Sequence, residues 1–192
     1  MFISALLLAA GESKRMGRPK LLLPLGGSTI IEQAVDNLLG SRVDEVVVVV
    51  GYRAQELERK IARKPVKIVR NRRYRQGMST SLIAGLSAID RRAQAIMVAL
   101  ADQPFVESPL IDELLEEFKK HDRGILVPVC QGRRGHPVVL SLKYRERLLA
   151  LRGDVGARQL IEENPDDVLE VPVESESVNV DLNTPEDYTR LV

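Results

Sequence analysis

The sequence predicts an α/β protein of three layers, in which helices cover both faces of a doubly wound, Rossmann-like and mostly parallel sheet. Two observations carry this prediction. Apolar runs alternate with amphipathic helical segments, and the run VVVVV at 46–50 needs cover on both faces, as parallel strands do. In addition, 192 residues without a Ser/Gly/Pro-rich linker suit a single domain, residues 1–192.

Strands and helices alternate over the first two thirds of the chain. The expected strands are short apolar runs, and the expected helices have apolar residues at helical spacing. Ser79 or Ser81 can cap the third helix, and Pro109 lies in the first turn of the fourth. In chain order we expect strand Phe2–Leu8, helix Thr29–Leu39, strand Glu45–Val50, helix Ala54–Arg63, strand Val66–Val69, a helix through Ile89, strand Ala95–Leu100 and a helix to about His121.

The order of elements changes after residue 123. Two apolar strands, Ile125–Cys130 and Pro137–Leu140, are separated by QGRRG, which is typical of a hairpin-like connection. We therefore expect a small antiparallel insertion on the same sheet. The remaining expected elements are helices Leu142–Leu151 and Val155–Glu163, strands near Val168–Val173 and Val178–Val180, and a last helix from Pro185 with Thr184 as its N-cap.

Composition and charge exclude several classes of function. The chain is 44% hydrophobic and 29% charged, as in ordinary soluble globular proteins. Its 28 basic and 27 acidic residues give a net charge of +1, which argues against nucleic acid or an anionic membrane as a partner. A single cysteine, Cys130, excludes an internal disulfide and fits a reducing cytosol. No secretory leader or membrane span is recognisable, so we expect a cytoplasmic protein.

The most informative segment is ISALLLAAGESKRMGRPK, residues 3–20. Its apolar run breaks at Gly11, and loops at the carboxyl ends of such strands bind ligands in open α/β sheets. Four cations within seven residues, spaced by glycine, suit a polyphosphate, although a solvated basic turn is the alternative. The glycine spacing matches neither a P-loop nor the dinucleotide fingerprint.

Two aspartates have positions that suit a divalent cation. Asp102 follows the apolar run AIMVALA, and Asp181 ends the segment VNVD, just before a predicted helix start. A turn or cap aspartate is the alternative for Asp102. Because Thr184 is the better N-cap of the last helix, Asp181 is free for another role.

The segment Leu8–Lys20 reads LAAGxSxRMGxxK and resembles the opening motif of the MobA-like nucleotidyltransferases. It is most similar to their molybdenum cofactor cytidylyltransferase branch, and the resemblance extends from Leu8 to Tyr188. This implies a nucleotide-diphospho-sugar transferase type of fold. AAG at 9–11 and DQP at 102–104 are typical of the branch that uses CTP.

The resemblance also implies roles for individual residues. Arg15, Lys20 and Asp102 are the catalytic set, in which Arg15 and Lys20 hold the triphosphate. Asp102 and Asp181 bind Mg²⁺ (or Mn²⁺). The implied nucleotide-binding set is Leu8, Ala9, Ala10, Gly11, Arg15, Lys20, Gly77, Ser79, Ser81 and Asp102.

Two further motifs, GHPVVL at 135–140 and GDxGAR at 153–158, recur in the cytidylyltransferase branch, on the side that receives the pterin. The resemblance therefore assigns His136, Asp154 and Arg158 to the second substrate, although a lone histidine is more often structural. Gly77 with Ser79 and Ser81 at a helix start offers free N–H groups to an anion or a base edge. An ordinary capped helix is the alternative.

The implied reaction moves CMP from Mg-CTP to the terminal phosphate of molybdopterin or the molybdenum cofactor and releases pyrophosphate. CTP and molybdopterin are then the small-molecule partners, with a possible transient contact to a molybdoenzyme or its chaperone. Three alternatives stay open: a GTP-using molybdenum cofactor guanylyltransferase, a sugar-1-phosphate nucleotidyltransferase, and a non-catalytic nucleotide-binding cofactor chaperone.

Overall fold

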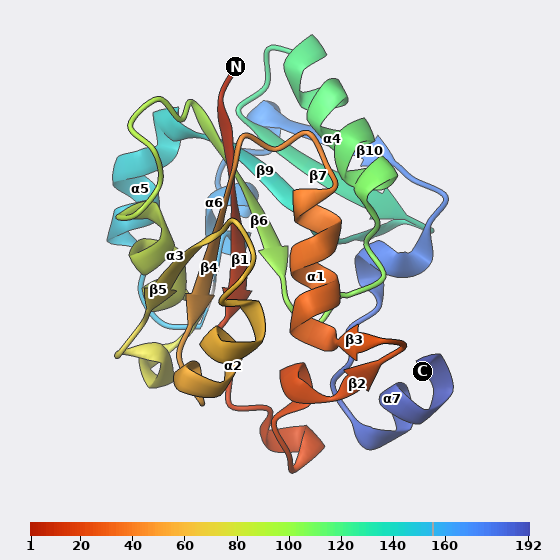
Figure 1. Ribbon diagram of the computed structural model, residues 1–192. Coiled ribbons are helices and arrows are strands. Elements are labelled where there is room, and N and C mark those ends of the chain that lie inside the picture. The colour runs from red at the N-terminus through yellow and green to blue at the C-terminus, as the bar shows by residue number, and fades with distance from the viewer. Residues whose placement is uncertain (155) are drawn as a thin grey trace.

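A mixed sheet of eight strands forms the centre of the protein (Figure 1). The structure is a computed structural model and describes residues 1–154 and 156–192. Seven strands follow one another in the order β10-β7-β9-β6-β1-β4-β5, and β8 pairs with β7. The strands of this sheet are β1 (Ile3–Ala9), β4 (Glu45–Val50), β5 (Lys67–Arg70), β6 (Ala95–Leu100), β7 (Ile125–Cys130), β8 (Arg133–Arg134), β9 (Val138–Ser141) and β10 (Val168–Pro172).

Strand directions confirm the predicted doubly wound, mostly parallel sheet. β1 runs parallel to both of its neighbours, β4 and β6, and β4 runs parallel to β5. β9 lies antiparallel between β6 and β7, so the expected antiparallel insertion enters the same sheet. The register pairs Leu8 with Val49 on one side and with Leu100 on the other, which brings the carboxyl ends of β1, β4 and β6 level.

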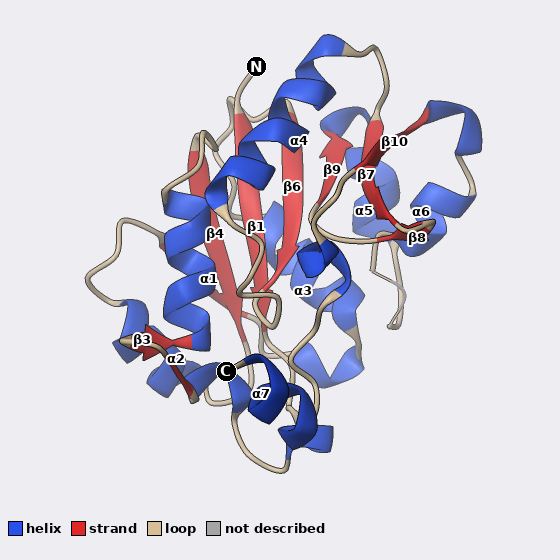
Figure 2. Ribbon diagram, turned by 90° about the vertical axis from the view of Figure 1, so that its right-hand side faces the viewer, coloured by secondary structure: helices blue, strands red, loops and turns tan. Residues whose placement is uncertain are grey.

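Helices cover both faces of the sheet and make three layers (Figures 1 and 2). Alternate strand residues point to opposite faces, so Val46, Val48 and Val50 pack in one apolar cluster and Val47 in another. The first cluster includes residues of α1, α2 and α4, and the second includes residues of α3, α5 and α6. The α-helices are α1 (Ile30–Leu39), α2 (Ala54–Ile61), α3 (Met78–Leu86), α4 (Ser108–Lys120), α5 (Arg145–Ala150), α6 (Arg158–Glu162) and α7 (Pro185–Leu191).

Local sequence signals set several boundaries as predicted. The α7 helix begins after Thr184, which exchanges hydrogen bonds with Asp187: the Asp187 carboxylate accepts from the Thr184 amide at 2.9 Å, and the Thr184 hydroxyl accepts from the Asp187 amide at 3.1 Å. The α1 helix begins after Thr29, whose amide donates to the Glu32 carboxylate at 3.0 Å. Strands β4, β6 and β7 have the predicted bounds.

The predicted serine cap of α3 is wrong. Gly77 is the N-cap, with a φ of 107°, and both Ser79 and Ser81 lie buried within the helix. Only glycine adopts this backbone conformation readily, and a close approach described below requires it.

Several other predicted elements differ from the structure. The helix expected over Leu142–Leu151, for example, is a 3-10 helix at Leu142–Tyr144 followed by α5. A strand at Val178–Val180 was expected, but this prediction is wrong, because Glu176–Asn179 forms a 3-10 helix, η6. The helix expected over Val155–Glu163 begins with a residue outside the described residues, and the structure has α6 from Arg158. A two-stranded antiparallel sheet of β2 (Pro24–Leu25) and β3 (Ser28–Thr29) was not predicted.

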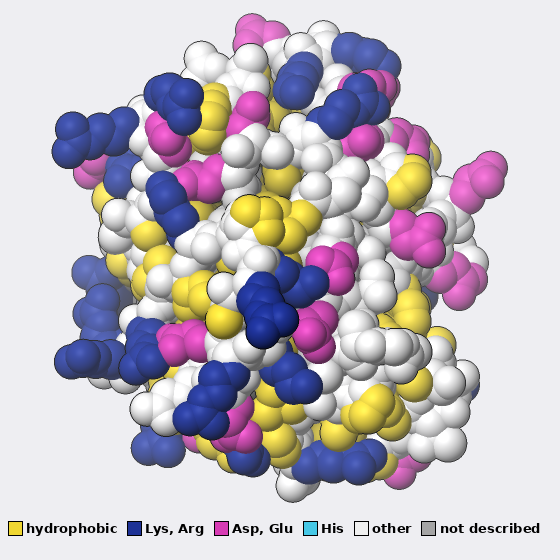
Figure 3. Space-filling model, in the orientation of Figure 1, with side chains coloured by type: hydrophobic (Ala, Val, Ile, Leu, Met, Phe, Trp, Pro, Cys, Tyr) yellow, Lys and Arg dark blue, Asp and Glu magenta, His cyan; other side chains and the backbone are white. Residues whose placement is uncertain are grey.

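The surface carries charges of both signs. On the face drawn in Figure 3, lysine and arginine side chains are mixed with carboxylates, as the net charge of +1 requires. Some pairs connect different segments, such as Lys64 in the loop after α2 and Asp36 of α1, whose charged atoms lie 2.5 Å apart. Such exposed pairs contribute only about 0–1 kcal/mol each to stability. Within the described residues, no helix combines the length and the apolar character that a membrane span needs.

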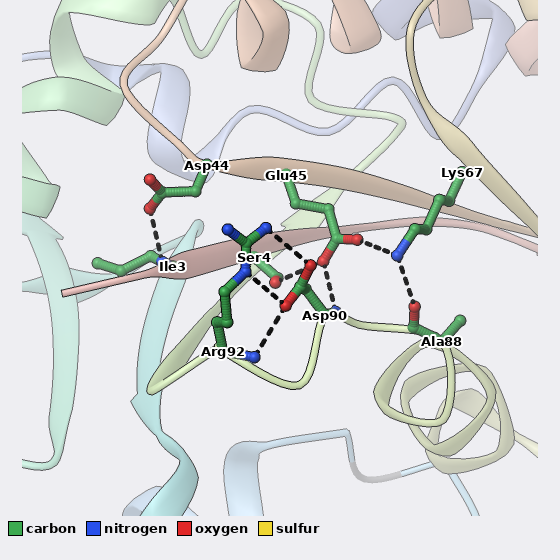
Figure 4. Close-up of polar contacts among 8 residues, drawn as sticks. All are labelled: Ile3, Ser4, Asp44, Glu45, Lys67, Ala88, Asp90 and Arg92. Carbon is green, nitrogen blue, oxygen red and sulfur yellow. Dashed lines mark hydrogen bonds and ion pairs between the residues drawn. The ribbon is translucent and has the colours of Figure 1, made fainter.

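A polar network lies around Glu45, at the amino ends of the central strands (Figure 4). One Glu45 oxygen accepts from Ser4 Oγ at 2.7 Å and from the Asp90 amide at 2.9 Å. The other oxygen lies 2.5 Å from Lys67 Nζ. Burial by itself raises the pKa of Glu45, but the hydrogen bonds from Lys67, Ser4 and the Asp90 amide outweigh it and hold the pKa below its usual range.

Replacing Glu45 with Gln is expected to lower the free energy of unfolding at neutral pH by about 1–3 kcal/mol, because charge-assisted hydrogen bonds are lost. The folded-state pKa of Glu45 is lowered, so its contribution is complete above the unfolded pKa of about 4.3 and disappears as the pH falls through the folded value. The stability difference between the two proteins should therefore shrink at acid pH. Urea unfolding of both proteins, from neutral to acid pH, measures this difference in the free energy of unfolding.

The matched control is Glu56→Gln, which removes the carboxylate of an exposed pair with Arg53 on α2. This change should leave the unfolding transition nearly unchanged. An equal loss of stability in both variants, or a Glu45→Gln loss that persists in acid, would contradict the assigned role of Glu45.

Candidate active site

A cavity of about 220 Å³ lies at the carboxyl ends of β1 and β6. Its walls come from β1 and the loop after it, from the start of α3 and from the residues that follow β6. The cavity thus lies at the carboxyl edge of the sheet, where ligands are expected to bind in open α/β folds. Eight residues of the predicted nucleotide-binding set line this nucleotide cavity: Leu8, Ala9, Ala10, Gly11, Lys20, Gly77, Ser81 and Asp102.

The loop after β1 is shaped by two left-handed residues and two buried anchors. Ser13 has a φ of 54° and Gly17 a φ of 68°, on either side of the short 3-10 helix η1 (Lys14–Met16). Met16 and Leu21 are buried, so the loop is fixed to the core by its apolar side chains. Lys20, at the start of the 3-10 helix η2 (Lys20–Leu22), is half-buried and lines the cavity.

Arg15 occupies a different position from Lys20. It lies exposed on η1 and is not among the residues that line the nucleotide cavity. Its implied contact with a triphosphate therefore stays a prediction. Ser79 is likewise outside the cavity lining. It is buried in α3, and its amide donates to the Gly153 carbonyl at 3.2 Å.

Lys20 and the two predicted metal ligands belong to one hydrogen-bonded group. Lys20 Nζ donates to Asp102 Oδ2 at 2.6 Å and to Asn183 Oδ1 at 2.8 Å. The Asn183 amide group in turn donates to Asp181 Oδ2 at 3.3 Å. The structure thus brings together Asp102 and Asp181, which are 79 residues apart in the chain.

Gln103 and a backbone bond hold the two aspartate segments side by side. Gln103 Nε2 donates to Asp181 Oδ1 at 2.7 Å and to the Val178 carbonyl at 3.3 Å. The Leu182 amide donates to the Asp102 carbonyl at 2.9 Å. Sequence reasoning missed Gln103 and Asn183 as site residues. Both could have been found from their closeness in sequence to an aspartate that ends an apolar segment: Gln103 follows Asp102, and Asn183 lies two residues after Asp181.

The donor set fits a magnesium ion that also binds substrate. Mg²⁺ prefers oxygen ligands and is usually held by one or two carboxylates together with substrate phosphates. Asp102 lines the cavity, whereas Asp181 lies outside its lining and is linked to Asp102 through Asn183 and Lys20. Over residues 1–154 and 156–192, no group of three or more His, Cys, Asp and Glu side chains could hold a metal.

The start of α3 packs against the 153–154 loop at the border of the cavity. A Cβ atom on Gly77 would lie 2.4 Å from the carbonyl carbon and oxygen of Gly153, so a side chain cannot be accommodated there. The Met78 amide donates to Asp154 Oδ1 at 3.0 Å. Ser81 Oγ accepts from the Asn71 side chain at 3.0 Å, which fixes the first turn of α3 to the loop after β5.

A second cavity of about 430 Å³ shares Met78 and Asp154 with the first. All three residues assigned to the second substrate, His136, Asp154 and Arg158, line it. Apolar side chains of β7, β9 and α6 form part of its wall, and Arg134 adds a second cation. We refer to it as the acceptor cavity, after the role predicted for these three residues; the carboxylates of Asp154 and Glu162 line it beside the two arginines.

His136 is half-buried and contacts η6 through its backbone. Its amide donates to the Val178 carbonyl at 2.9 Å. Burial lowers the pKa of His136, while the negative charges of Asp181 and Asp102 act in the opposite direction and keep the shift smaller. A lowered pKa favours the neutral imidazole at pH 7, which can donate one hydrogen bond and accept another.

Replacing Gly77 with Ala is expected to destabilise the protein by about 1–3 kcal/mol, because the new Cβ meets backbone atoms and the φ is positive. The matched control is Gly11→Ala, where nothing lies within 4 Å of an added Cβ. Denaturant unfolding of both variants measures the difference. Equal stability of the two variants would show that the contact between Gly77 and the 153–154 loop is dispensable.

Comparison with known proteins finds relatives that match nearly the whole chain. The chain is 34% identical to nicotine blue oxidoreductase of Paenarthrobacter nicotinovorans, over 99% of this chain and 96% of that protein. It is 27% identical to molybdenum cofactor cytidylyltransferase of Escherichia coli (strain K12), over 97% of this chain and 93% of the relative.

The structure is also similar to a Mycobacterium tuberculosis H37Rv protein that was crystallised with manganese. The TM-score is 0.86 at 27% sequence identity, and the match covers 100% of this chain and 98% of the other. A family model of the MobA-like NTP transferase domain matches residues 5–168, most of the cavity-lining residues included. The chain therefore belongs to the MobA-like NTP transferase family.

Proposed function

We propose that this protein is a cytidylyltransferase that moves CMP from Mg-CTP to the terminal phosphate of molybdopterin or of its metallated form. A phosphate oxygen of the acceptor forms a bond to the α-phosphorus of CTP. The bond between that phosphorus and the oxygen bridging it to the β-phosphate breaks, and pyrophosphate leaves. This proposal is supported by the position of Met78 and Asp154, which line both the nucleotide cavity and the acceptor cavity and so place the two cavities next to each other.

The chemistry needs little from the protein beyond positioning and charge. A phosphate monoester has a second pKa of about 6, so it is substantially ionised at neutral pH and needs no general base. Asp102 and Asp181 would hold the metal. When bound, Mg²⁺ neutralises phosphate charge that develops as pyrophosphate departs. Lys20, which lines the nucleotide cavity, supplies a mobile positive charge for the same phosphates.

The acceptor cavity supports an anionic ring compound as the second substrate. Arg134 and Arg158 provide cations at its rim, where Arg158 is paired with Glu162 at 2.8 Å. Val127 and Val138 provide an apolar surface on which a planar heterocycle can lie. The proposed CTP preference rests on the segments AAG at 9–11 and DQP at 102–104. A transient contact with a molybdoenzyme or its chaperone and a cytoplasmic location belong to the same proposal.

The names of two relatives point to different chemistry, one to an oxidoreductase and one to a cytidylyltransferase. Pyrophosphate release should be measured with CTP, GTP, ATP and UTP, each with Mg²⁺ and with or without molybdopterin. We expect release with CTP that depends on molybdopterin. Preference for GTP would favour a guanylyltransferase, and turnover with sugar 1-phosphates alone would favour a sugar nucleotidyltransferase. Binding of CTP without any turnover would favour a cofactor chaperone.

A parallel assay should follow oxidation of a reduced nicotinamide dinucleotide in the presence of a quinoid dye, because one relative is named as an oxidoreductase. We expect no protein-dependent oxidation. A robust rate there, with no pyrophosphate release from any nucleotide, would overturn the proposed reaction.

Replacement of either aspartate, in Asp102→Asn or Asp181→Asn, is expected to lower Mg²⁺-dependent turnover by at least roughly a hundredfold, because each change removes an anionic ligand of the metal. Circular dichroism should be unchanged in both variants. Asp36→Asn, which alters a surface pair with Lys64, serves as the control and should retain full turnover. Near-normal turnover in an aspartate variant would remove that residue from the metal site.

A further inference from the structure

The Lys20 ammonium lies where oxygen donors of the site converge. It is 2.6 Å from Asp102 Oδ2 and 2.8 Å from Asn183 Oδ1, and only 12% of its side chain is exposed. Asp181 is joined to the same group through the amide of Asn183. A positive charge of the protein itself thus lies among the oxygens that the proposed function assigns to the metal.

A divalent cation and this ammonium compete for the same carboxylate. An ammonium hydrogen-bonded at 2.6 Å takes up one oxygen of Asp102 and repels a second cation nearby. The partial burial of Lys20 and Asp102 makes this repulsion stronger than it would be in open water. The other carboxylate is engaged as well, because Asp181 accepts from Gln103 at 2.7 Å and from Asn183 at 3.3 Å.

Lys20 also has an alternative place for its charge. It lines the nucleotide cavity together with Gly11 and Gly77, the two glycines at the predicted phosphate-binding segments. A lysine ammonium ends a flexible four-carbon stem, so it can turn from a carboxylate to a phosphate without a change in the backbone. The Lys20 backbone stays in place, because the buried Leu21 follows it in the chain and the Lys20 carbonyl accepts a hydrogen bond from the Leu23 amide at 3.0 Å.

We infer that Lys20 holds the cation position of the nucleotide-free protein and keeps divalent metal out until nucleotide phosphates draw its ammonium away. This inference rests on the proposed function, which assigns Asp102 and Asp181 to the metal. It makes the uptake of metal dependent on the nucleotide. By linkage, each of the two then raises the affinity for the other by the same factor.

The test is a titration of the nucleotide-free protein with Mn²⁺, followed by the electron paramagnetic resonance signal of the free ion. Wild type should bind Mn²⁺ weakly. Lys20→Met, which removes the charge at similar length, should bind at least about tenfold more tightly, within the usual range of coupling between sites. Lys20→Arg keeps a cation and should remain weak. Circular dichroism verifies each fold, and Lys20→Gln replaces the Met variant if that one is unfolded.

Two further variants fix the location of the effect. Lys64→Met removes an ammonium that is paired with Asp36 on the surface, and it should leave Mn²⁺ affinity unchanged. Adding Asp102→Asn to Lys20→Met should cancel the gain in affinity. A gain that survives this second change would contradict the inference, because the new site would then not involve Asp102.

A thermal-shift measurement with Mg²⁺ and each of CTP, GTP, ATP and UTP distinguishes a failure of the inference about Lys20 from a failure of the proposed function. If Mg-CTP stabilises wild type but Lys20→Met binds Mn²⁺ no better than wild type, the inference about Lys20 is wrong and the proposed function stands. If wild type responds to no Mg-nucleotide at all, the proposed function is wrong. Tight binding of Mn²⁺ by nucleotide-free wild type would also overturn the inference.

Discussion

The site depends on the level alignment of β1, β4 and β6. Because Leu8 is in register with Val49 and with Leu100, the chain leaves all three strands at one edge. The approach there is close: a Cβ on Gly51, just after β4, would lie 2.7 Å from the Tyr74 side chain. The parallel sheet thus gathers, within one cavity, segments that lie far apart in the chain.

The two edges of the sheet have different roles in the molecule. At the amino ends of the strands, the polar groups around Glu45 satisfy one another, and the carboxylate is surrounded by donors from three segments. At the carboxyl ends, Lys20 and Asp102 line a space that another molecule can fill, and Asp181 is linked to them through Asn183. Among the described residues, Gln103 Oε1 is a buried oxygen without a hydrogen-bond partner, and it too lies beside Asp181.

Much of the fold could be predicted from the sequence, because its signals are local. A run of five valines and a Thr184–Asp187 cap each specify an element with little help from the rest of the chain. The start of α3 could not be predicted in the same way. Its serines are suitable caps, but the close approach of Gly77 to Gly153 is a tertiary contact, and it decides which residue precedes the helix.

The same distinction applies to the site. Asp102 and Asp181 could be found because each one ends an apolar segment. Gln103 and Asn183 act only once these segments lie side by side, which requires the bond from the Leu182 amide to the Asp102 carbonyl. Arg15 came from the family resemblance alone, and its exposed position outside the cavity lining leaves its role a prediction.

Met78 belongs to the walls of both cavities, and this has a consequence for how such proteins can diverge. Met78 is 37% exposed. A Cβ on Gly156 would lie 2.8 Å from the Met78 sulfur, so the Met78 side chain fits only because position 156 has no side chain. A larger or smaller residue at 78 reshapes the room for the nucleotide and for its acceptor together. Arg134, Arg158 and Ile161 line the acceptor cavity but not the nucleotide cavity, so substitutions at these positions can change the first and leave the second intact.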